Sequence, residues 1–198
     1  MQENETSVST PESQPAAGEQ AVKPQHRAGL WSAISWVRDL AFSILIAVVL
    51  IVFIYQPVKV EGTSMLPTLS DQERIFINKF TYRFGLEDIR RGDTVVFWWP
   101  LDPTKSYIKR VIGLPGDTVR IDDGQVYING VHEDFVPAQF RDHSSWGPRV
   151  VPPNDYFVLG DHRSSSSDSR TWDWVPRRNI YGKAVFVYWP LDKMGRVQ

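Results

Sequence analysis

The 198-residue sequence contains no cysteine. This absence excludes a disulfide-stabilised scaffold, a zinc site with thiolate ligands and a catalytic thiol, although it does not identify the cellular compartment. The sequence also has almost no excess charge, because 22 lysine and arginine residues stand against 23 aspartate and glutamate residues, for a formal net charge of −1. Nucleic-acid-binding proteins are typically basic, so we expect no nucleic-acid partner.

Aromatic residues are absent from positions 1–29, a segment rich in glutamate, glutamine, serine, proline and alanine. Such a composition cannot bury enough apolar surface to offset the entropy that is lost on ordering. The sequence therefore predicts a disordered tail over residues 1–29.

Charged residues are absent from positions 40–58, which read LAFSILIAVVLIVFIYQPV. As a helix this run is roughly 28 Å long, close to the hydrocarbon thickness of a bilayer. Trp36 and Tyr55 flank it, as aromatic residues at a membrane interface do. Together with its flanks, the segment 30–58 is predicted to form a transmembrane anchor helix that ends at Pro57.

Two alternatives to an anchor are a buried core helix and a cleaved signal peptide. The residues after the apolar run, YQPVKVEGT at 55–63, lack the small-residue pattern that a cleavage site requires. An uncleaved anchor is therefore the better interpretation. Lys23, Arg27 and Arg38 precede it, whereas only Lys59 follows directly, so the positive-inside rule places the tail in the cytoplasm and the rest of the chain outside.

The rest of the chain, residues 59–198, shows strand patterns without alternating helices. A mostly β, antiparallel domain is therefore predicted. Short segments that are rich in β-branched and aromatic residues predict its strands at residues 73–80, 93–99, 107–113, 117–122, 125–130, 155–160 and 182–189.

Turn residues connect several of these strands. DDG at 122–124 predicts a hairpin turn. LPGD at 114–117 predicts a type II turn, in which the proline fixes φ and the glycine supplies a positive φ. Residues 131–154 show little periodicity and predict a long surface loop.

A candidate nucleophile, Ser64, lies in VEGTSMLPTL, directly after the apolar segment. A serine hydroxyl attacks a carbonyl only when a base takes its proton and donors stabilise the oxyanion. The base is either a histidine or a neutral lysine with a lowered pKa. The histidines of the chain are His26, His132, His143 and His162.

A candidate lysine base lies in the predicted strand 107–113. Side chains alternate along a strand, so Lys109 shares one face with Tyr107 and Val111. If this face is inward, the amine is poorly hydrated and its neutral form is favoured. Arg110 points the other way and suits an ion pair. The alternative is a solvated lysine on an edge strand.

The segment GDHRSSSSDSR, residues 160–170, alternates acidic and basic residues. Asp161, Arg163, Asp168 and Arg170 are able to pair with one another or with Arg110. The alternative is a flexible, solvated loop with weak surface pairs.

The motifs GTSMLPTL, RGDTVVF, YIKRVIGLPGD and GDHRSSSSDSR follow an apolar segment in this order. Together they resemble the motif boxes of bacterial type I signal peptidases (leader peptidases), the membrane-bound Ser/Lys serine endopeptidases that remove signal peptides from exported preproteins. The resemblance extends over residues 35–190.

The resemblance implies a monomeric enzyme in the bacterial cytoplasmic membrane, with its β catalytic domain on the extracytoplasmic side. Its partners are then signal peptides and the lipid bilayer, and it needs no metal or cofactor. The resemblance also implies that Ser64 is the nucleophile, that Lys109 is the general base and that the Ser166 hydroxyl orients the lysine. Salt bridges among Asp161, Arg163, Asp168, Arg170 and Arg110 are implied to hold the site.

The residues around Ser64 suit a substrate pocket. Gly62 allows close approach of the substrate backbone, and Met65, Leu66 and Pro67 are expected to wall the site. Many members of the family carry a serine at the position of Gly62 whose hydroxyl helps to bind the oxyanion, so the second oxyanion donor is open here.

Further residues near these motifs have open roles. His162 stands where the family usually has asparagine, and we expect a structural role for it, although a Ser/His variant stays open. Trp98 and Trp99 fit either contact with lipid or ordinary packing. At the level of the whole chain, the alternatives are a self-cleaving Ser/Lys protease of another kind and an inactive, membrane-anchored β module that binds peptides.

Overall fold

The computed structural model describes residues 28–80, 85 and 87–197. The predicted disordered tail lies outside these residues except at its last two positions, so its disorder stays a prediction. The chain separates into two compact units that divide between Ile44 and Leu45.

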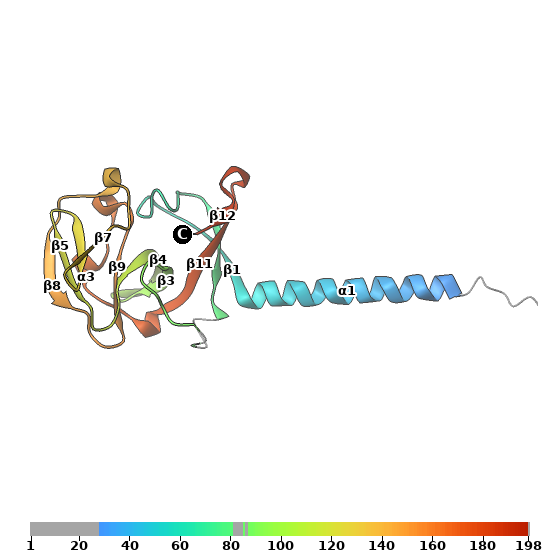
Figure 1. The fold of residues 1–198 in the computed structure, drawn as a ribbon. Helices are drawn as coiled ribbons and strands as arrows, with labels where there is room; N and C mark the ends of the chain where they lie inside the picture. The colour runs from blue at the N-terminus through green and yellow to red at the C-terminus, as the bar shows by residue number, and fades with distance from the viewer. Residues whose placement is uncertain (1–27, 81–84, 86, 198) are drawn as a thin grey trace, which may run out of the picture. The chain divides into compact units, whose positions relative to one another are not determined.

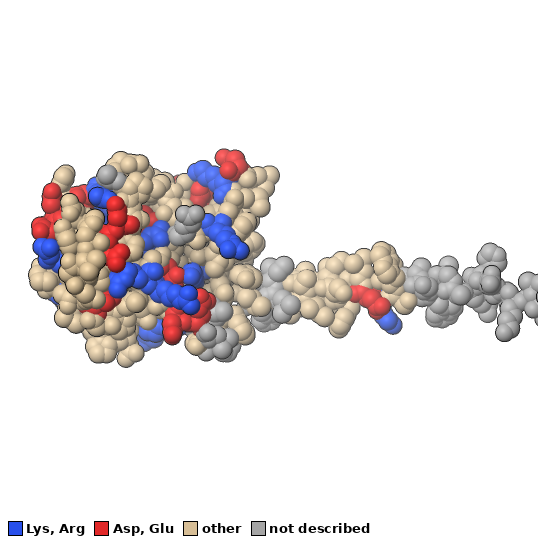
Figure 2. Space-filling view, in the orientation of Figure 1, with Lys and Arg blue, Asp and Glu red and all other residues tan. Residues whose placement is uncertain are grey.

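The helix α1 (Ala28–Ile54) contains 27 residues and confirms that residues 40–54 of the apolar run are helical. Its Arg38 and Asp39 side chains lie 2.8 Å apart. Figure 2 shows that the described part of the helix is tan except for one small blue and red patch. Among the helices that the structure describes, none has the combination of length and apolar character that is needed to cross a membrane.

The helix ends earlier than predicted, at Ile54, and residues 55–59 form the strand β1 (Tyr55–Lys59). Pro57 explains this early end, because proline has no N–H to donate and disfavours helical geometry in the residue before it. β1 pairs antiparallel with β2 (Arg74–Asn78), from Tyr55 opposite Asn78 to Lys59 opposite Arg74.

The larger sheet is eight-stranded, with its main path in the order β1-β2-β11-β3-β4-β9-β10 and β12 paired to β11. All of its pairs are antiparallel. Its other strands are β3 (Thr94–Trp99), β4 (Asp102–Gly113), β9 (Asp155–Leu159), β10 (Val175–Pro176), β11 (Ile180–Trp189) and β12 (Gly195–Arg196).

A second, four-stranded antiparallel sheet has the order β7-β6-β5-β8. In Figure 1 its strands lie at the opposite end of the β domain from β1 and β11. Its members are β5 (Thr118–Asp122), β6 (Gln125–Ile128), β7 (Val131–Glu133) and β8 (Trp146–Val150).

Buried side chains form three hydrophobic clusters within the β domain. One is centred on β3, β4 and β9, a second packs β2 and β11 against Met65 and Leu69, and the third lies under the smaller sheet. The second cluster positions the candidate nucleophile, because Met65 directly follows Ser64 and is almost fully buried.

The predicted strands are all confirmed, and so are both turns. Asp123 and Gly124 carry positive φ in the hairpin between β5 and β6. The Asp117 N–H donates to the Leu114 carbonyl, and Gly116 has φ +86, as a type II turn requires. The predicted loop at 131–154 is wrong in part, because it contains β7, β8 and the short helix η2 (Ala138–Phe140).

Candidate active site

Ser64 and Lys109 lie side by side, although they are 45 positions apart in the sequence: Lys109 Nζ is 2.7 Å from Ser64 Oγ. Ser64 lies in the turn after β1, which is closed by the hydrogen bond from the Leu69 N–H to the Met65 carbonyl. Lys109 lies in the interior of β4, opposite Val95 of β3. The turn after β1 and the paired strand β4 therefore bring the Ser64 hydroxyl and the Lys109 amine together.

The predicted desolvation of Lys109 is confirmed, because only 4% of the residue is exposed. Burial lowers the pKa of Lys109 from about 10.5 to about 8, and the negative charges of Asp168 and Asp161 partly oppose this effect. The aromatic ring of Tyr107, whose centroid is 5.5 Å from Nζ, lies on the same face of β4. A substantial fraction of the amine is therefore neutral near pH 8.

Hydrogen bonds hold the backbone around Ser64. The Ser64 carbonyl accepts the His162 N–H at 3.0 Å. Within the described residues the Ser64 N–H has no hydrogen-bond acceptor, which leaves it available to a substrate. The Gly62 N–H donates instead to the Asp71 carboxylate at 2.8 Å, so it is occupied. Gly62 adopts φ +91, a conformation that favours glycine.

Arg110 and Asp161 form a buried, bidentate ion pair that ties β4 to the segment after β9. Arg110 donates to both Asp161 oxygens, at 2.8 and 2.7 Å. Thr68 closes this cluster, since its hydroxyl donates to Asp161 at 2.6 Å and accepts from Arg110 at 3.0 Å. The predicted pairing of Arg110 is therefore found.

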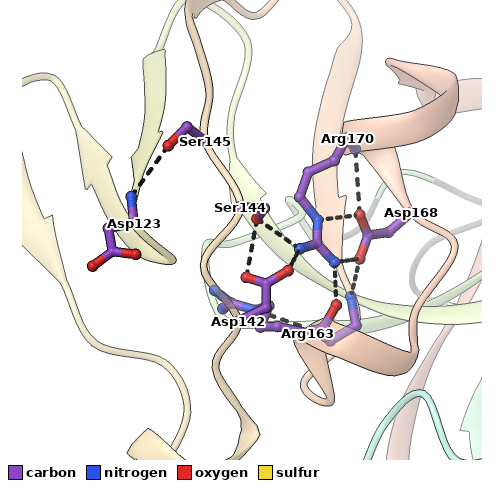
Figure 3. A network of polar contacts seen from close by, with 8 residues as sticks. Asp123, Asp142, Ser144, Ser145, Arg163, Asp168 and Arg170 are labelled. Carbon is purple, nitrogen blue, oxygen red and sulfur yellow. Dashed lines mark hydrogen bonds and ion pairs between the residues drawn. The ribbon is translucent and has the colours of Figure 1, made fainter.

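Asp168 and Arg170 form a second ion pair, in the turn that enters α3 (Ser169–Trp172). Figure 3 shows the Arg170 guanidinium between the carboxylates of Asp168 and Asp142. Asp168 also accepts the Gly160 N–H at 3.1 Å, and Ser144 accepts from Arg170 at 3.0 Å. This network connects the segment before the smaller sheet's β8 to the segment beside Ser64.

Arg163 differs from its predicted role. It is buried, but no carboxylate pairs with it among the described residues; its Nε donates to the Gly160 carbonyl at 3.1 Å. Its own carbonyl accepts from Arg170 at 2.6 Å. Burial, together with the nearby charge of Arg170, lowers the pKa of Arg163 to about 10, so the guanidinium stays charged at neutral pH.

Ser166 and His162 lie next to the nucleophile in different ways. The Ser166 hydroxyl is buried and has no hydrogen-bond partner among the described residues, so its contact with Lys109 stays a prediction. His162 contacts Ser64 through its backbone, whereas its ring packs edge-on against Phe140 with centroids 5.4 Å apart. A side-chain contact with Phe140 is consistent with the expected structural role.

A cleft of about 330 Å³, here called the Ser64 cleft, contains both Ser64 and Lys109. Two continuous segments line much of it and are here called its walls, residues 58–62 and residues 106–109. Both walls have an unpaired edge within the described sheet: β1 pairs only with β2, and residues 106–109 pair only with β3. The cleft therefore offers backbone groups to an extended peptide on both sides.

Only some of the predicted pocket residues line the Ser64 cleft. Gly62 and Met65 line the Ser64 cleft. Leu66 is not among the described residues that line it, and Pro67 borders another cavity, together with Thr68 and Glu73. The prediction that Leu66 and Pro67 wall the site is thus wrong for this cleft, because the turn after Ser64 carries Pro67 away from it.

Three further residues support the site and were not predicted from the sequence: Thr68, Asp71 and Asp142. Thr68 had a signal, because it lies within the motif GTSMLPTL and its hydroxyl needs a partner when buried. Asp71 and Asp142 had none that a single sequence reveals. Among the described residues, no cluster of histidine, aspartate and glutamate side chains could hold a metal ion.

Comparisons with known proteins agree with these motifs. The family model described as "Signal peptidase, peptidase S26" matches residues 33–189. A signal peptidase I of Leptolyngbya laminosa is 36% identical over 95% of this chain and 92% of its own length. Signal peptidase I S of Bacillus subtilis is 38% identical over 82% of this chain and 92% of its own length. A crystallised signal peptidase I of Enterococcus faecalis is 30% identical and aligns with 49% of this chain and 97% of its own, with a TM-score of 0.43.

Proposed function

The chain belongs to the signal peptidase family, peptidase S26, and removes signal peptides as a serine protease of the signal peptidase I type; we propose that Ser64 and Lys109 carry out this reaction. The observation that carries the proposal is the 2.7 Å approach of Lys109 Nζ to Ser64 Oγ in a buried setting. The alternatives of an inactive module and of a self-cleaving protease of another kind have no comparable support.

The proposed mechanism is acyl transfer. Neutral Lys109 accepts the proton of the Ser64 hydroxyl while Oγ attacks the scissile carbonyl carbon. The protonated lysine then gives this proton to the amine that leaves, and an acyl-enzyme remains on Ser64. Lys109 next takes a proton from water, whose oxygen attacks the ester carbonyl carbon. As the ester bond breaks, Lys109 gives this proton to Ser64 Oγ, which releases the signal peptide and restores the neutral lysine and the serine hydroxyl. The lowered pKa of Lys109, about 8, supports its role as the base.

The oxyanion of the tetrahedral intermediate is proposed to bind the Ser64 N–H, which has no acceptor among the described residues. Gly62 supplies no hydroxyl, and its N–H donates to Asp71. Asp71 therefore acts on the site by fixing the turn that carries the Ser64 N–H.

The supporting residues act as positioning groups. Arg110 and Asp161, with Thr68, fix β4 and thus the Lys109 backbone. Asp168 and Arg170 fix the segment whose His162 N–H binds the Ser64 carbonyl. Ser166 is proposed to orient the Lys109 amine once substrate displaces solvent from the cleft.

The substrate is proposed to bind as an added β-strand between residues 58–62 and 106–109. The unpaired edges of both walls support this proposal. Side chains at positions −1 and −3 from the cut then point to the same side, toward the wall that contains Met65, and position −2 points away. A cleft of about 330 Å³ favours small residues at −1 and −3.

The uncharged residues 40–54, which lie within α1, support the proposal of a single N-terminal anchor in the bacterial cytoplasmic membrane. We place residues 1–29 in the cytoplasm, the anchor within 30–54 and the catalytic domain, from Tyr55 onward, on the extracytoplasmic side. Every group in the proposed mechanism comes from one chain, which supports a functional monomer. The proposed partners are signal peptides and the lipid bilayer, and the proposed chemistry uses no cofactor.

The test is a cleavage assay with one preprotein and the full chain in lipid vesicles. Ser64→Ala and Lys109→Ala are each expected to lower kcat/KM by several orders of magnitude, because each removes half of the dyad. His162→Ala is the matched control and is expected to stay close to wild type. A folded Lys109→Ala variant that cleaves like wild type would disprove the dyad.

A further inference from the structure

A second cleft, of about 740 Å³, borders the Ser64 cleft and shares Tyr181 with it. We propose that this second cleft binds the phosphate headgroup of an anionic phospholipid. It is called the basic cleft below and is defined by Lys79, Trp98, Arg177, Arg178 and Tyr181. The proposal rests on the membrane anchoring proposed above and adds a specific lipid contact to it.

The charge of the basic cleft suits a phosphate. Three cationic side chains line it, Lys79, Arg177 and Arg178, against one carboxylate, that of Asp155. The chain as a whole has a net charge of −1, so this positive concentration is local. Lysine binds phosphate as a point charge, and arginine binds it through a planar fork.

The aromatic wall of the cleft suits the boundary between lipid and water. Trp98 and Tyr181 stack with ring centroids 4.6 Å apart, and Lys79 Nζ lies 5.4 Å from the Tyr181 ring. Trp98 remains 44% exposed, and its carbonyl accepts from Asn179, which holds the end of β3 in place. Indole rings concentrate at headgroup depth, with their apolar part toward the acyl chains.

The position of the basic cleft favours a lipid over an acidic peptide. The Tyr181 hydroxyl donates to Ser106, which lies roughly 10 Å along β4 from Lys109. Tyr181 thus marks the end of the Ser64 cleft that is remote from the dyad. The facing wall runs from Gly62 back to Val58 and continues in the chain to α1, the proposed anchor. Leu101, which is 68% exposed, follows Trp98 in the turn after β3 and adds apolar surface.

The test measures binding of water-soluble dihexanoyl lipids to the full chain in uncharged detergent by calorimetry. We expect dihexanoyl-phosphatidylglycerol to bind at least tenfold more tightly than dihexanoyl-phosphatidylcholine. Lys79→Gln/Arg178→Gln should weaken phosphatidylglycerol binding roughly 25-fold, because each cation contributes about fivefold. Arg120→Gln/Arg149→Gln removes the same charge from the smaller sheet and should change nothing.

Several outcomes would overturn the proposal. These are equal affinity for the two lipids, equal loss in both double variants, or displacement of phosphatidylglycerol by an equal concentration of inorganic phosphate, which would identify a site for soluble anions. Cleavage of a soluble peptide by the same preparations is measured in parallel. This cleavage needs the dyad and not the lipid. If the wild-type protein does not cleave the peptide, the proposed function is contradicted. If it cleaves the peptide but binds both lipids with equal affinity, only the proposed lipid site is contradicted.

Discussion

Two opposing effects determine the pKa of Lys109. Burial favours the neutral amine, whereas the charges of Asp161 and Asp168 favour the ammonium, and burial prevails. Both aspartates already pair with arginines, Asp161 with Arg110 and Asp168 with Arg170, which limits their attraction for a further positive charge. The salt bridges near the proposed dyad thus help to keep the lysine neutral as well as in position.

The first prediction concerns pH. Only the neutral form of Lys109 accepts a proton, and its pKa is about 8. We therefore expect kcat/KM for a peptide without titratable groups to rise tenfold per pH unit below about pH 8 and to level off above it. Stopped-time assays between pH 6 and 10 measure this profile. A limb near the ordinary lysine pKa, about 10.5, would contradict a desolvated base.

The second prediction concerns the stability cost of this base. The folded-state pKa of Lys109, about 8, lies below its ordinary value of 10.5. The folded chain therefore binds fewer protons in this window, so its stability is lowest below pH 8 and increases as the pH rises from 8 to 10.5. Lys109→Met should raise the free energy of unfolding at pH 7 by roughly 2–3 kcal/mol and remove this increase.

Urea unfolding of wild type and Lys109→Met at pH 7 and pH 10 measures both effects. Lys105→Met, at an exposed lysine of the same strand, is the control and should leave the stability and its pH dependence unchanged. A Lys109→Met chain that is less stable than wild type at pH 7 would show that the lysine contributes packing that methionine cannot replace.

At the scale of elements, the segment after β9 packs against the turn that carries Ser64. Gly160 lies at this contact: a Cβ there would be 2.2 Å from Ser166 Oγ and 2.6 Å from the Ser64 carbonyl oxygen. The Ser64 carbonyl also accepts the His162 N–H, so the two segments have no room to separate without losing this bond. The close approach requires glycine for steric reasons.

The third prediction follows from this contact. Gly160→Ala should lower kcat by at least tenfold, because the added methyl displaces either Ser64 or Ser166, and should cost about 1–3 kcal/mol of stability. Gly195→Ala is the matched control, since a Cβ at Gly195 would contact nothing within 4 Å. The kcat and the thermal unfolding of both variants are measured. Equal kcat values for Gly160→Ala and Gly195→Ala would show that the segment after β9 shifts to accommodate the added methyl group without disturbing the site.

Local patterns were enough to predict the strands with regular alternation, but they left open whether Lys109 is buried or solvated, and the family resemblance decided for a base. They missed β8, whose sequence WGPRV contains glycine and proline, and β1, whose residues continue an apolar run without a change of period. The pair of Arg170 with Asp142 was beyond a single sequence, because these residues are 28 positions apart and meet only through the fold. The resemblance, rather than any pattern, singled out Ser166.

At the scale of the whole molecule, the catalytic domain begins with β1. β1 covers one edge of β2, and Val58 packs against the buried cluster that contains Met65. Its last residues also form one wall of the Ser64 cleft. We therefore propose that the catalytic domain includes β1, which places its boundary before Tyr55, inside the segment that the sequence predicted to be the anchor.

The fourth prediction compares two truncated chains. A chain that starts at Tyr55 should fold and cleave a soluble peptide, because it keeps β1. A chain that starts at Val60 should lose roughly 2 kcal/mol or more of stability, since the edge of β2 and the apolar contacts of Val58 become exposed. It should also lose most of its activity. Urea unfolding and peptide cleavage measure the difference, and equal behaviour of both chains would show that β1 is dispensable.

The 45 positions that separate Ser64 and Lys109 along the chain determine when the proposed dyad is able to form during synthesis. A nascent chain that has exposed its serine still lacks the strand that brings the amine to it, and an unpaired lysine in water keeps its proton at neutral pH. Under the proposed mechanism, proteolytic activity therefore requires that β3, β4 and the segment after β9 have folded together. If the proposed dyad is correct, incomplete folding by itself keeps the chain inactive during its synthesis.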